Sequence, residues 1–148
     1  MTVYRICEAK HPANDGEGAR LAGGRWNHKG TPLVYCGATA SLCALEVLAH
    51  SAALPADMIV IGARIPKSVS IRTIEEAELP ANWNRPVATK KTKDLGTSWV
   101  KSGTTAVLSV PSVVVPNERN YLLNPAHPDF SKIRFFAPKP FVFDRRLK

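Results

Sequence analysis

The sequence lacks any apolar run approaching the ~20 residues that a membrane-spanning helix requires. Its N-terminus, MTVYRICEAK, contains no basic segment followed by an apolar stretch and a small-residue cleavage site. We therefore expect no membrane association, no secretory signal and a cytoplasmic protein. Nothing repeats at a fixed period and no linker divides the chain, so its 148 residues predict one domain, residues 1–148.

Disulfide and metal-binding patterns are also missing. The three cysteines, Cys7, Cys36 and Cys43, are an odd number in a chain without an export signal, which argues against a disulfide framework. We interpret them as small core residues. Because no CxxC or HxxxH pair is present to fix a ligand geometry, we expect no metal site.

The sequence has no glycine-rich phosphate loop and no serine-hydrolase or metalloprotease motif. The glycine pairs at 16–18 and 23–24 lack the spacing of a dinucleotide or Walker motif. A phosphate-bearing ligand would therefore have to be held by side chains. Arg5 and Arg25 are the candidates, since a guanidinium group binds phosphate oxygens bidentately.

Acidic residues are few: 12 stand against 20 lysines and arginines, which gives a net charge of +8. We therefore expect an anionic partner or substrate. Nucleic acid, a nucleotide and an acidic protein segment all satisfy this requirement. A basic nucleic-acid-binding module is one alternative, and it predicts salt-sensitive binding to DNA or RNA.

The pattern that is present is typical of an α+β domain built on mainly antiparallel sheet. Helical periodicity and bounding residues predict helices over residues 41–51, capped by Thr39 or Ser41, and 92–102, stopped by Gly103. Short apolar segments predict strands over residues 2–6, 33–36, 58–65, 69–72, 106–110, 113–115, 133–136 and 141–143. Residues 7–24 are expected to form a long loop.

Glu46 lies on the almost wholly apolar helix predicted for residues 41–51. At about 100° per residue it occupies, with His50, the wedge between two apolar faces, so its carboxylate is expected to be half-buried. A buried charge needs a cation or several hydrogen-bond donors. Arg25 is the nearest candidate in sequence, and we expect it to pair with Glu46.

Six short motifs occur in order along the chain: YRI at 4–6, GGRWN at 23–27, VY at 34–35, ALEVLAH at 44–50, VPS at 110–112 and NYLLNPAHP at 120–128. Together they resemble the RES domain family, and the resemblance covers nearly the whole chain. The family is the toxin half of bacterial toxin–antitoxin pairs whose Xre-type antitoxin has a helix-turn-helix DNA-binding domain. The resemblance implies a compact α+β domain similar to the ADP-ribosyltransferase toxins, with a diphtheria-toxin-like fold.

The resemblance also implies site residues. The family's arginine, tyrosine, glutamate and serine positions fall here on Arg5, Arg25, Tyr35, Glu46 and Ser112. The predicted catalytic residues are Glu46, Arg25 and Ser112, and the predicted substrate-binding residues are Arg5, Tyr35, Gly24, Trp26 and Asn124. Because Ser109 is a second serine nearby, the choice of Ser112 depends on the Pro-Ser pair.

These residue types suit cleavage of a nicotinamide–ribose bond. Nicotinamide leaves through an oxocarbenium-like state, which the Glu46 carboxylate would stabilise electrostatically. Tyr35 would stack on the cationic nicotinamide ring, and Arg5 and Arg25 would clamp the pyrophosphate. Ser112 would bond the nicotinamide amide or a ribose oxygen.

The function implied by the resemblance is a toxin that depletes NAD+, its substrate, with water or phosphate as the acceptor and no further cofactor or metal. Transfer of ADP-ribose to a protein is the enzymatic alternative. It uses the same donor and the same residues, so the sequence does not separate the two. The expected partners are the Xre-type antitoxin and a second copy of the toxin, with no membrane and no direct nucleic-acid contact.

Overall fold

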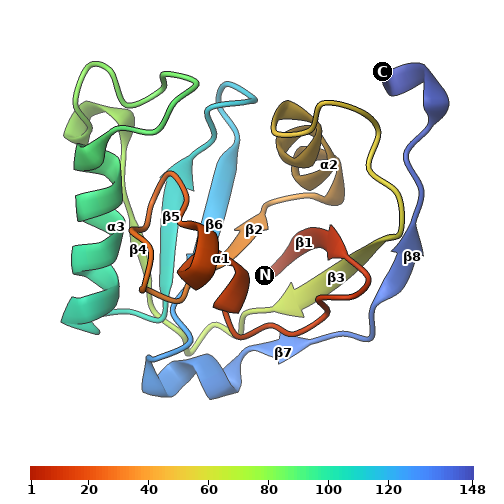
Figure 1. Ribbon diagram of the computed structural model, residues 1–148. Helices are drawn as coiled ribbons and strands as arrows, with labels where there is room; N and C mark the ends of the chain where they lie inside the picture. Colours follow the sequence, from red (N-terminus) through yellow and green to blue (C-terminus); the bar gives the residue numbers. More distant parts are fainter.

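The computed structural model describes residues 1–148 as one curled eight-stranded sheet with three α-helices packed against it (Figure 1). The strands are β1 (Thr2–Glu8), β2 (Val34–Gly37), β3 (Met58–Arg64), β4 (Ile71–Thr73), β5 (Val107–Pro111), β6 (Arg119–Leu123), β7 (Arg134–Phe135) and β8 (Lys139–Phe141). The helices are α1 (Glu17–Ala22), α2 (Ala40–Ala49) and α3 (Lys90–Ser102), with short 3-10 turns η1 (Glu76–Glu78), η2 (Pro128–Lys132) and η3 (Arg145–Leu147). All strand pairs are antiparallel except β4 with β5, which confirms the predicted α+β class.

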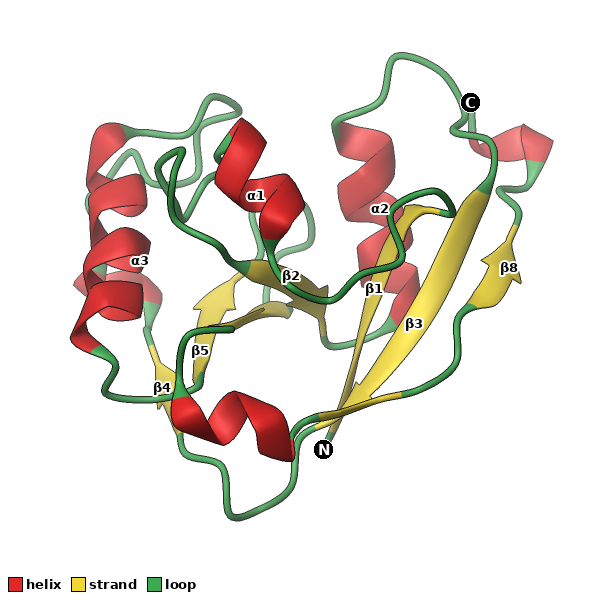
Figure 2. Ribbon diagram, turned by 60° about the horizontal axis from the view of Figure 1, so that its bottom comes forward, coloured by secondary structure: helices red, strands yellow, loops and turns green.

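The sheet is almost divided between β1 and β2. In the order β4-β5-β6-β2-β1-β3-β7, with β8 also beside β3, β1 and β2 pair only at Tyr4 and Gly37. By contrast, β1 pairs with β3 along its whole length and β2 pairs with β6 along its whole length. We call β4, β5, β6 and β2 the β5–β6 half, and β1, β3, β7 and β8 the β1–β3 half. Figure 2 shows the two halves diverging from this junction.

Helix α2 follows β2 and packs against the β1–β3 half. Thr39 caps its N-terminus by accepting a hydrogen bond from the backbone N–H of Leu42, 3.0 Å away. Its buried residues Cys43 and Leu48 join Ile6 of β1 in one apolar cluster. Burying a leucine side chain is worth about 1.5–3 kcal/mol, so this apolar face is what holds α2 in place. The helix predicted for residues 41–51 and its cap are confirmed.

Helix α3 covers the β5–β6 half. It begins at the Thr89 cap and ends at Gly103, whose φ of 61° is the left-handed conformation that glycine tolerates, as predicted. Trp99 is buried against Trp26 and Leu108. None of the three helices combines the length and the apolar character needed to cross a membrane.

Three sequence predictions about secondary structure are wrong, and the strand predicted for residues 141–143 lies instead at Lys139–Phe141 (β8). Residues 113–115 form a turn and not a strand, and the strand β6 (Arg119–Leu123) was not predicted. The loop predicted for 7–24 contains α1, a six-residue helix with no buried residue and therefore no apolar periodicity. Strand β6 was missed because turn-forming asparagines stand at both ends, and its central place in the sheet depends on partners distant in the chain.

Candidate active site

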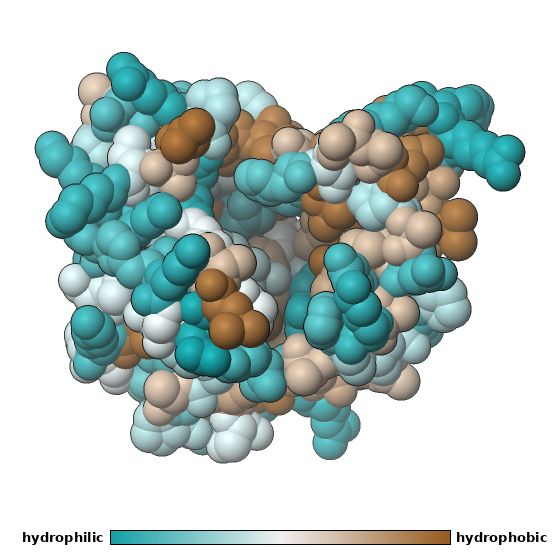
Figure 3. Space-filling model, viewed as in Figure 1, coloured by the Kyte–Doolittle hydropathy of each residue, from teal (hydrophilic) through white to brown (hydrophobic).

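A cavity of about 690 Å³ opens where the two halves of the sheet diverge. The surface is visibly hollowed there, between the part that carries α3 and the part that carries α2 (Figure 3). The walls come from α1, β1, β2, α2, the start of β6 and the segments 23–26, 86–93 and 111–113. Of the eight predicted site residues, the cavity is lined by six: Arg5, Gly24, Arg25, Trp26, Tyr35 and Glu46.

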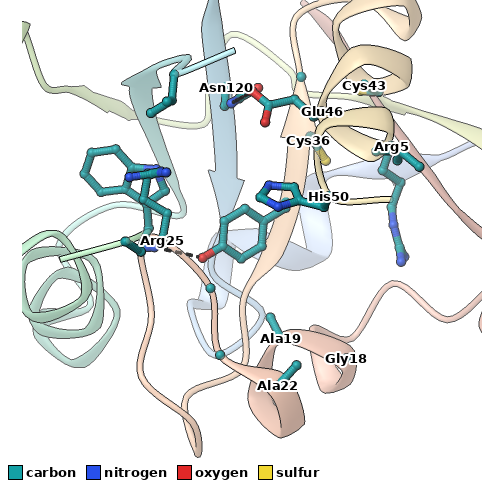
Figure 4. Close-up of a pocket in the computed structure, with 18 of the residues that line it drawn as sticks. Arg5, Gly18, Ala19, Ala22, Arg25, Cys36, Cys43, Glu46, His50 and Asn120 are labelled. Carbon is teal, nitrogen blue, oxygen red and sulfur yellow. Dashed lines mark hydrogen bonds between the residues drawn. The ribbon is translucent and has the colours of Figure 1, made fainter. Parts of the chain in front are cut away.

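The Glu46 carboxylate is half-buried on α2, as predicted, but its partners differ from the prediction. Its Oε1 atom accepts hydrogen bonds from Ser112 Oγ at 2.8 Å and from Asn120 Nδ2 at 2.7 Å. Figure 4 shows Asn120 pointing at Glu46 from β6. The predicted ion pair between Glu46 and Arg25 is wrong: two uncharged donors hold the carboxylate.

Ser112 follows β5 and is buried. Its Oγ accepts hydrogen bonds from the backbone N–H groups of Val114 and Val115, at 3.1 and 3.0 Å. The single hydroxyl proton is therefore directed to Glu46. The neighbouring Ser109 accepts from Arg119 Nε at 2.6 Å, so Ser112 is the serine that contacts the carboxylate. With its proton committed, Ser112 acts on Glu46 and has no proton left to donate to a substrate.

The Arg25 guanidinium lies on the other wall of the cavity. It donates to three backbone carbonyls, those of Trp83 at 2.8 Å, Arg85 at 2.7 Å and Pro86 at 3.2 Å. Burial lowers the pKa of Arg25, and the charge of Glu46 opposes that shift. Arg25 therefore fastens the segment that carries Pro86 to the cavity wall, and its charge is not neutralised by any carboxylate.

Tyr35, on β2, lines the same cavity. Its hydroxyl donates to Asn27 Oδ1 at 2.7 Å and accepts from the backbone N–H of Trp26 at 3.0 Å. Burial raises the pKa of this phenol, so Tyr35 stays neutral. A side chain at Gly24 would place its Cβ 2.6 Å from the Tyr35 oxygen, which explains the glycine there.

Asn27, which was not among the predicted site residues, organises the loop that carries Arg25. Its side chain is fully buried, and Nδ2 donates to the carbonyls of Ala19, His28 and Thr31. Helix α3 closes the loop from outside: a Cβ at Gly96 would lie 1.8 Å from the Trp26 carbonyl oxygen. The loop is thus fixed by backbone contacts before any ligand arrives.

Arg5 and Asn124 are placed differently from each other. Arg5 lines the cavity from β1, and its Nη1 donates to Ala13 O at 2.6 Å and Asn14 Oδ1 at 2.8 Å, leaving Nε and Nη2 without a protein acceptor. Asn124 is buried outside the cavity, where it donates to the Val100 carbonyl at 3.1 Å. The structure therefore brings Arg5 to the site and does not bring Asn124 to it.

Asn120, His50 and Lys93 are among the other residues that line the cavity. Asn120 belongs to the NYLLNPAHP motif, and recognising strand β6 would have directed attention to it. His50 ends α2, one turn beyond Glu46, and lies beside the cavity in Figure 4. With Arg5, Arg25 and Lys93 on its walls and Glu46 as its carboxylate, the cavity is electropositive overall. No three His, Cys, Asp or Glu side chains converge as a metal site would require.

This fold has a counterpart among solved structures. The chain superposes with a TM-score of 0.68, at 19% identity, on a chain of the crystal structure of the M. tuberculosis MbcT–MbcA toxin–antitoxin complex, covering 99% of this chain and 85% of that one. Residues 2–144 match the RES domain model, and the chain belongs to the RES domain family.

Curated relatives have the same extent as this chain. A protein named Toxin Res from Yersinia enterocolitica is 37% identical over the full length of both chains. Another Toxin Res, from Photorhabdus laumondii, is 38% identical over 99% of this chain and 97% of its own. A Prs ADP-ribosylating toxin from Sphingobium sp. is 36% identical over 89% of this chain and 84% of its own. The predicted family and its toxin character are confirmed.

Proposed function

We propose that this protein is a toxin enzyme that cleaves the nicotinamide–ribose bond of NAD+, with water or phosphate as the acceptor. The observation that carries this proposal is the state of Glu46. Two uncharged donors bind one carboxylate oxygen, and no cation neutralises the group. A carboxylate held in this way keeps its negative charge available for a developing positive charge.

The reaction needs little acid help because nicotinamide is already cationic in the substrate. The C1′–N bond breaks, its electron pair leaves with neutral nicotinamide, and the ribose passes through an oxocarbenium-like state. Glu46 stabilises that positive charge. The acceptor oxygen then bonds to C1′, and the acceptor's proton passes to solvent. Glu46 is the one carboxylate among the residues that line the cavity, so no second carboxylate assists the acceptor.

The contacts of the two arginines divide their roles. Arg25 already donates to three carbonyls, so it attracts the pyrophosphate chiefly through its charge. Arg5 has Nε and Nη2 free of protein acceptors and is the better direct ligand for a phosphate oxygen. Tyr35 supplies a neutral aromatic surface for the nicotinamide ring.

Transfer of ADP-ribose to a protein is the second candidate. The relative from Sphingobium, 36% identical, is named an ADP-ribosylating toxin, and its name favours this outcome. The donor and the first bond cleavage are the same in both reactions. They differ only in whether a small acceptor or a protein side chain enters the cleft.

We also propose an antitoxin that covers this cleft. A structural relative is part of a toxin–antitoxin complex, and the net charge of +8 favours an acidic segment in the partner. A helix-turn-helix antitoxin of the Xre type and a toxin homodimer are the assembly we expect. The competing idea, a nucleic-acid-binding module, rests on the basic charge alone.

The decisive experiment incubates the purified protein with NAD+ labelled on the adenylate phosphate, with and without inorganic phosphate. Nicotinamide release with the label in a small product supports cleavage, and phosphate dependence identifies the acceptor. Label retained on a protein band would move the choice to transferase. Glu46→Gln should abolish both outcomes, whereas Glu76→Gln, an exposed change outside the cavity, should abolish neither. The enzyme proposal would be refuted if the wild type consumed no NAD+ and nucleic-acid binding survived Glu46→Gln.

A further inference from the structure

Asn120 is held rigidly at the start of β6. This strand lies between β2 and β5, and Asn120 pairs with Gly37 on one side and with Val110 on the other. A residue in a central strand has its backbone fixed by both neighbours. Its side chain therefore reaches the cavity from a base that does not move with the flanking loops.

The direction of the Asn120 amide is set by the charge it meets. Glu46 as a carboxylate only accepts hydrogen bonds, so the N–H₂ end of Asn120 must face it. The distance of 2.7 Å is that of a charge-assisted hydrogen bond. Because Ser112 donates to the same Oε1 atom at 2.8 Å, both donors converge on one oxygen.

The other oxygen of Glu46 is left open. Oε2 accepts no hydrogen bond, yet no buried side-chain oxygen lacks a partner in this structure. Oε2 must therefore have accessible surface, and both Glu46 and Asn120 line the cavity. Oε1 is therefore anchored by two hydrogen bonds, and Oε2 remains available to a ligand in the cavity.

We propose that Asn120 is a positioning residue, which anchors Oε1 of the Glu46 carboxylate and turns Oε2 toward the ligand. The expected effect of Asn120 on catalysis rests on the proposed function. The positioning of Glu46 by Asn120 does not, because it can be observed without turnover. The hydroxyl of Ser112 alone would allow the carboxylate to swing about a single bond, whereas a second donor from a separate strand fixes its plane. An uncharged amide is the suitable donor because a lysine or arginine would form an ion pair and cancel the charge.

The test replaces Asn120 by two residues of different character. Asn120→Asp keeps the shape but sets a second carboxylate against Glu46, and two carboxylates at this distance share a proton. We expect the acid limb of the pH profile of kcat/KM for NAD+ loss to move up by about one pH unit or more. Asn120→Ala should lower kcat by about 10- to 100-fold with a smaller change in KM.

Asn82→Asp is the matched control, since Asn82 is exposed outside the cavity and the net charge changes equally. It should leave the acid limb unmoved. A purely structural role for Asn120 would lower the rate at every pH without moving that limb. Circular dichroism of each variant checks that the fold persists, and Asn120→Ala keeps the test available if Asn120→Asp does not fold.

A second readout is independent of turnover. The ¹³C signal of the Glu46 carboxyl, assigned by its loss in Glu46→Gln, should titrate at higher pH in Asn120→Asp than in the wild type. This result would support positioning even if the wild type consumed no NAD+. An unchanged titration together with wild-type rates in both Asn120 variants overturns the proposal.

Discussion

The two walls of the cavity hold opposite charges by the same means. On the wall formed by α2, the Glu46 carboxylate accepts hydrogen bonds from Ser112 and Asn120. On the facing wall, next to α3, three backbone carbonyls accept hydrogen bonds from the Arg25 guanidinium. In each case uncharged dipoles hold the ion, and the two ions do not pair with each other. A direct ion pair would have neutralised both.

The two walls differ in the kind of atoms that hold the charged group. Glu46 is held by side chains, so single substitutions can remove its donors one at a time. Arg25 is held by main-chain atoms, so only the shape of the loop or the guanidinium itself can be changed. Dipoles that stabilise a charge without cancelling it suit a ligand with a cationic ring at one end and a pyrophosphate at the other.

The largest expected effect comes from removing the negative charge. Glu46→Gln keeps the size of the side chain but cannot stabilise the oxocarbenium-like state, so kcat for NAD+ loss should fall on the order of 10²- to 10³-fold. NAD+ binding, measured by calorimetry, should change much less, because Arg5, Arg25 and Tyr35 remain. Wild-type turnover in this variant would remove Glu46 from the site.

The matching change on the other wall is Arg25→Lys. A lysine keeps the charge but has no planar fork, so it cannot bind three carbonyls at once. Losing hydrogen bonds from a charged group costs about 1.5–3 kcal/mol, which corresponds to about 10- to 100-fold in kcat/KM. Steady-state kinetics checks the loss. If Arg25→Lys behaved as the wild type, charge alone would explain this wall, and the carbonyl contacts would be irrelevant.

A smaller effect tests whether α3 holds the Arg25 loop in place. Gly96→Ala sets a methyl group 1.8 Å from the Trp26 carbonyl oxygen, so the helix and the loop must separate. We expect a loss of about 1–3 kcal/mol in the free energy of unfolding, measured by urea denaturation. Gly18→Ala is the control, because a Cβ there meets nothing within 4 Å. Equal stability of the two variants would contradict this packing.

The last effect concerns three neutral side chains that line the cavity, Tyr35, Cys36 and Cys43, and it appears only at alkaline pH. Burial raises the pKa of the Cys43 thiol to about 12, and it also raises those of Cys36 and Tyr35. In the unfolded chain these groups lose their protons first, from about pH 8.5 for a thiol. The unfolded state then binds fewer protons, so stability should be fully present below that pH and should decline as pH rises toward 12.

Cys43→Ala tests the alkaline prediction, because the variant lacks one of the raised groups. Each such group contributes a slope of up to about 1.4 kcal/mol per pH unit. Urea unfolding between pH 8 and 11 should therefore give a shallower decline for the variant than for the wild type. Parallel slopes would mean that the thiol is not protected by burial.

Local features of the sequence predicted local features of the structure. The caps at Thr39 and Gly103 and the apolar faces of α2 and α3 depend only on neighbouring residues, and they were predicted correctly. Strand β6 was not, since its place between β2 and β5 is a long-range property. Its absence from the prediction also hid Asn120.

The site was predicted by residue type more accurately than by contact. The family motifs identified Glu46, Tyr35 and both arginines, which all line the cavity. The pairing of Glu46 with Arg25 was wrong because proximity in sequence was taken for proximity in space. The true partners of Glu46 lie 66 and 74 residues further along the chain, and only the completed sheet brings them together.

The single rung between β1 and β2, at Tyr4 and Gly37, makes the molecule resemble a clasp. The two halves of the sheet are joined by this one pair of residues. Across the opening they are also linked by the hydrogen bonds from Ser112 and Asn120 to Glu46 on α2. The carboxylate proposed for catalysis therefore also links the two sides of the cavity. Losing these two hydrogen bonds would therefore free the carboxylate and the mouth of the cleft together.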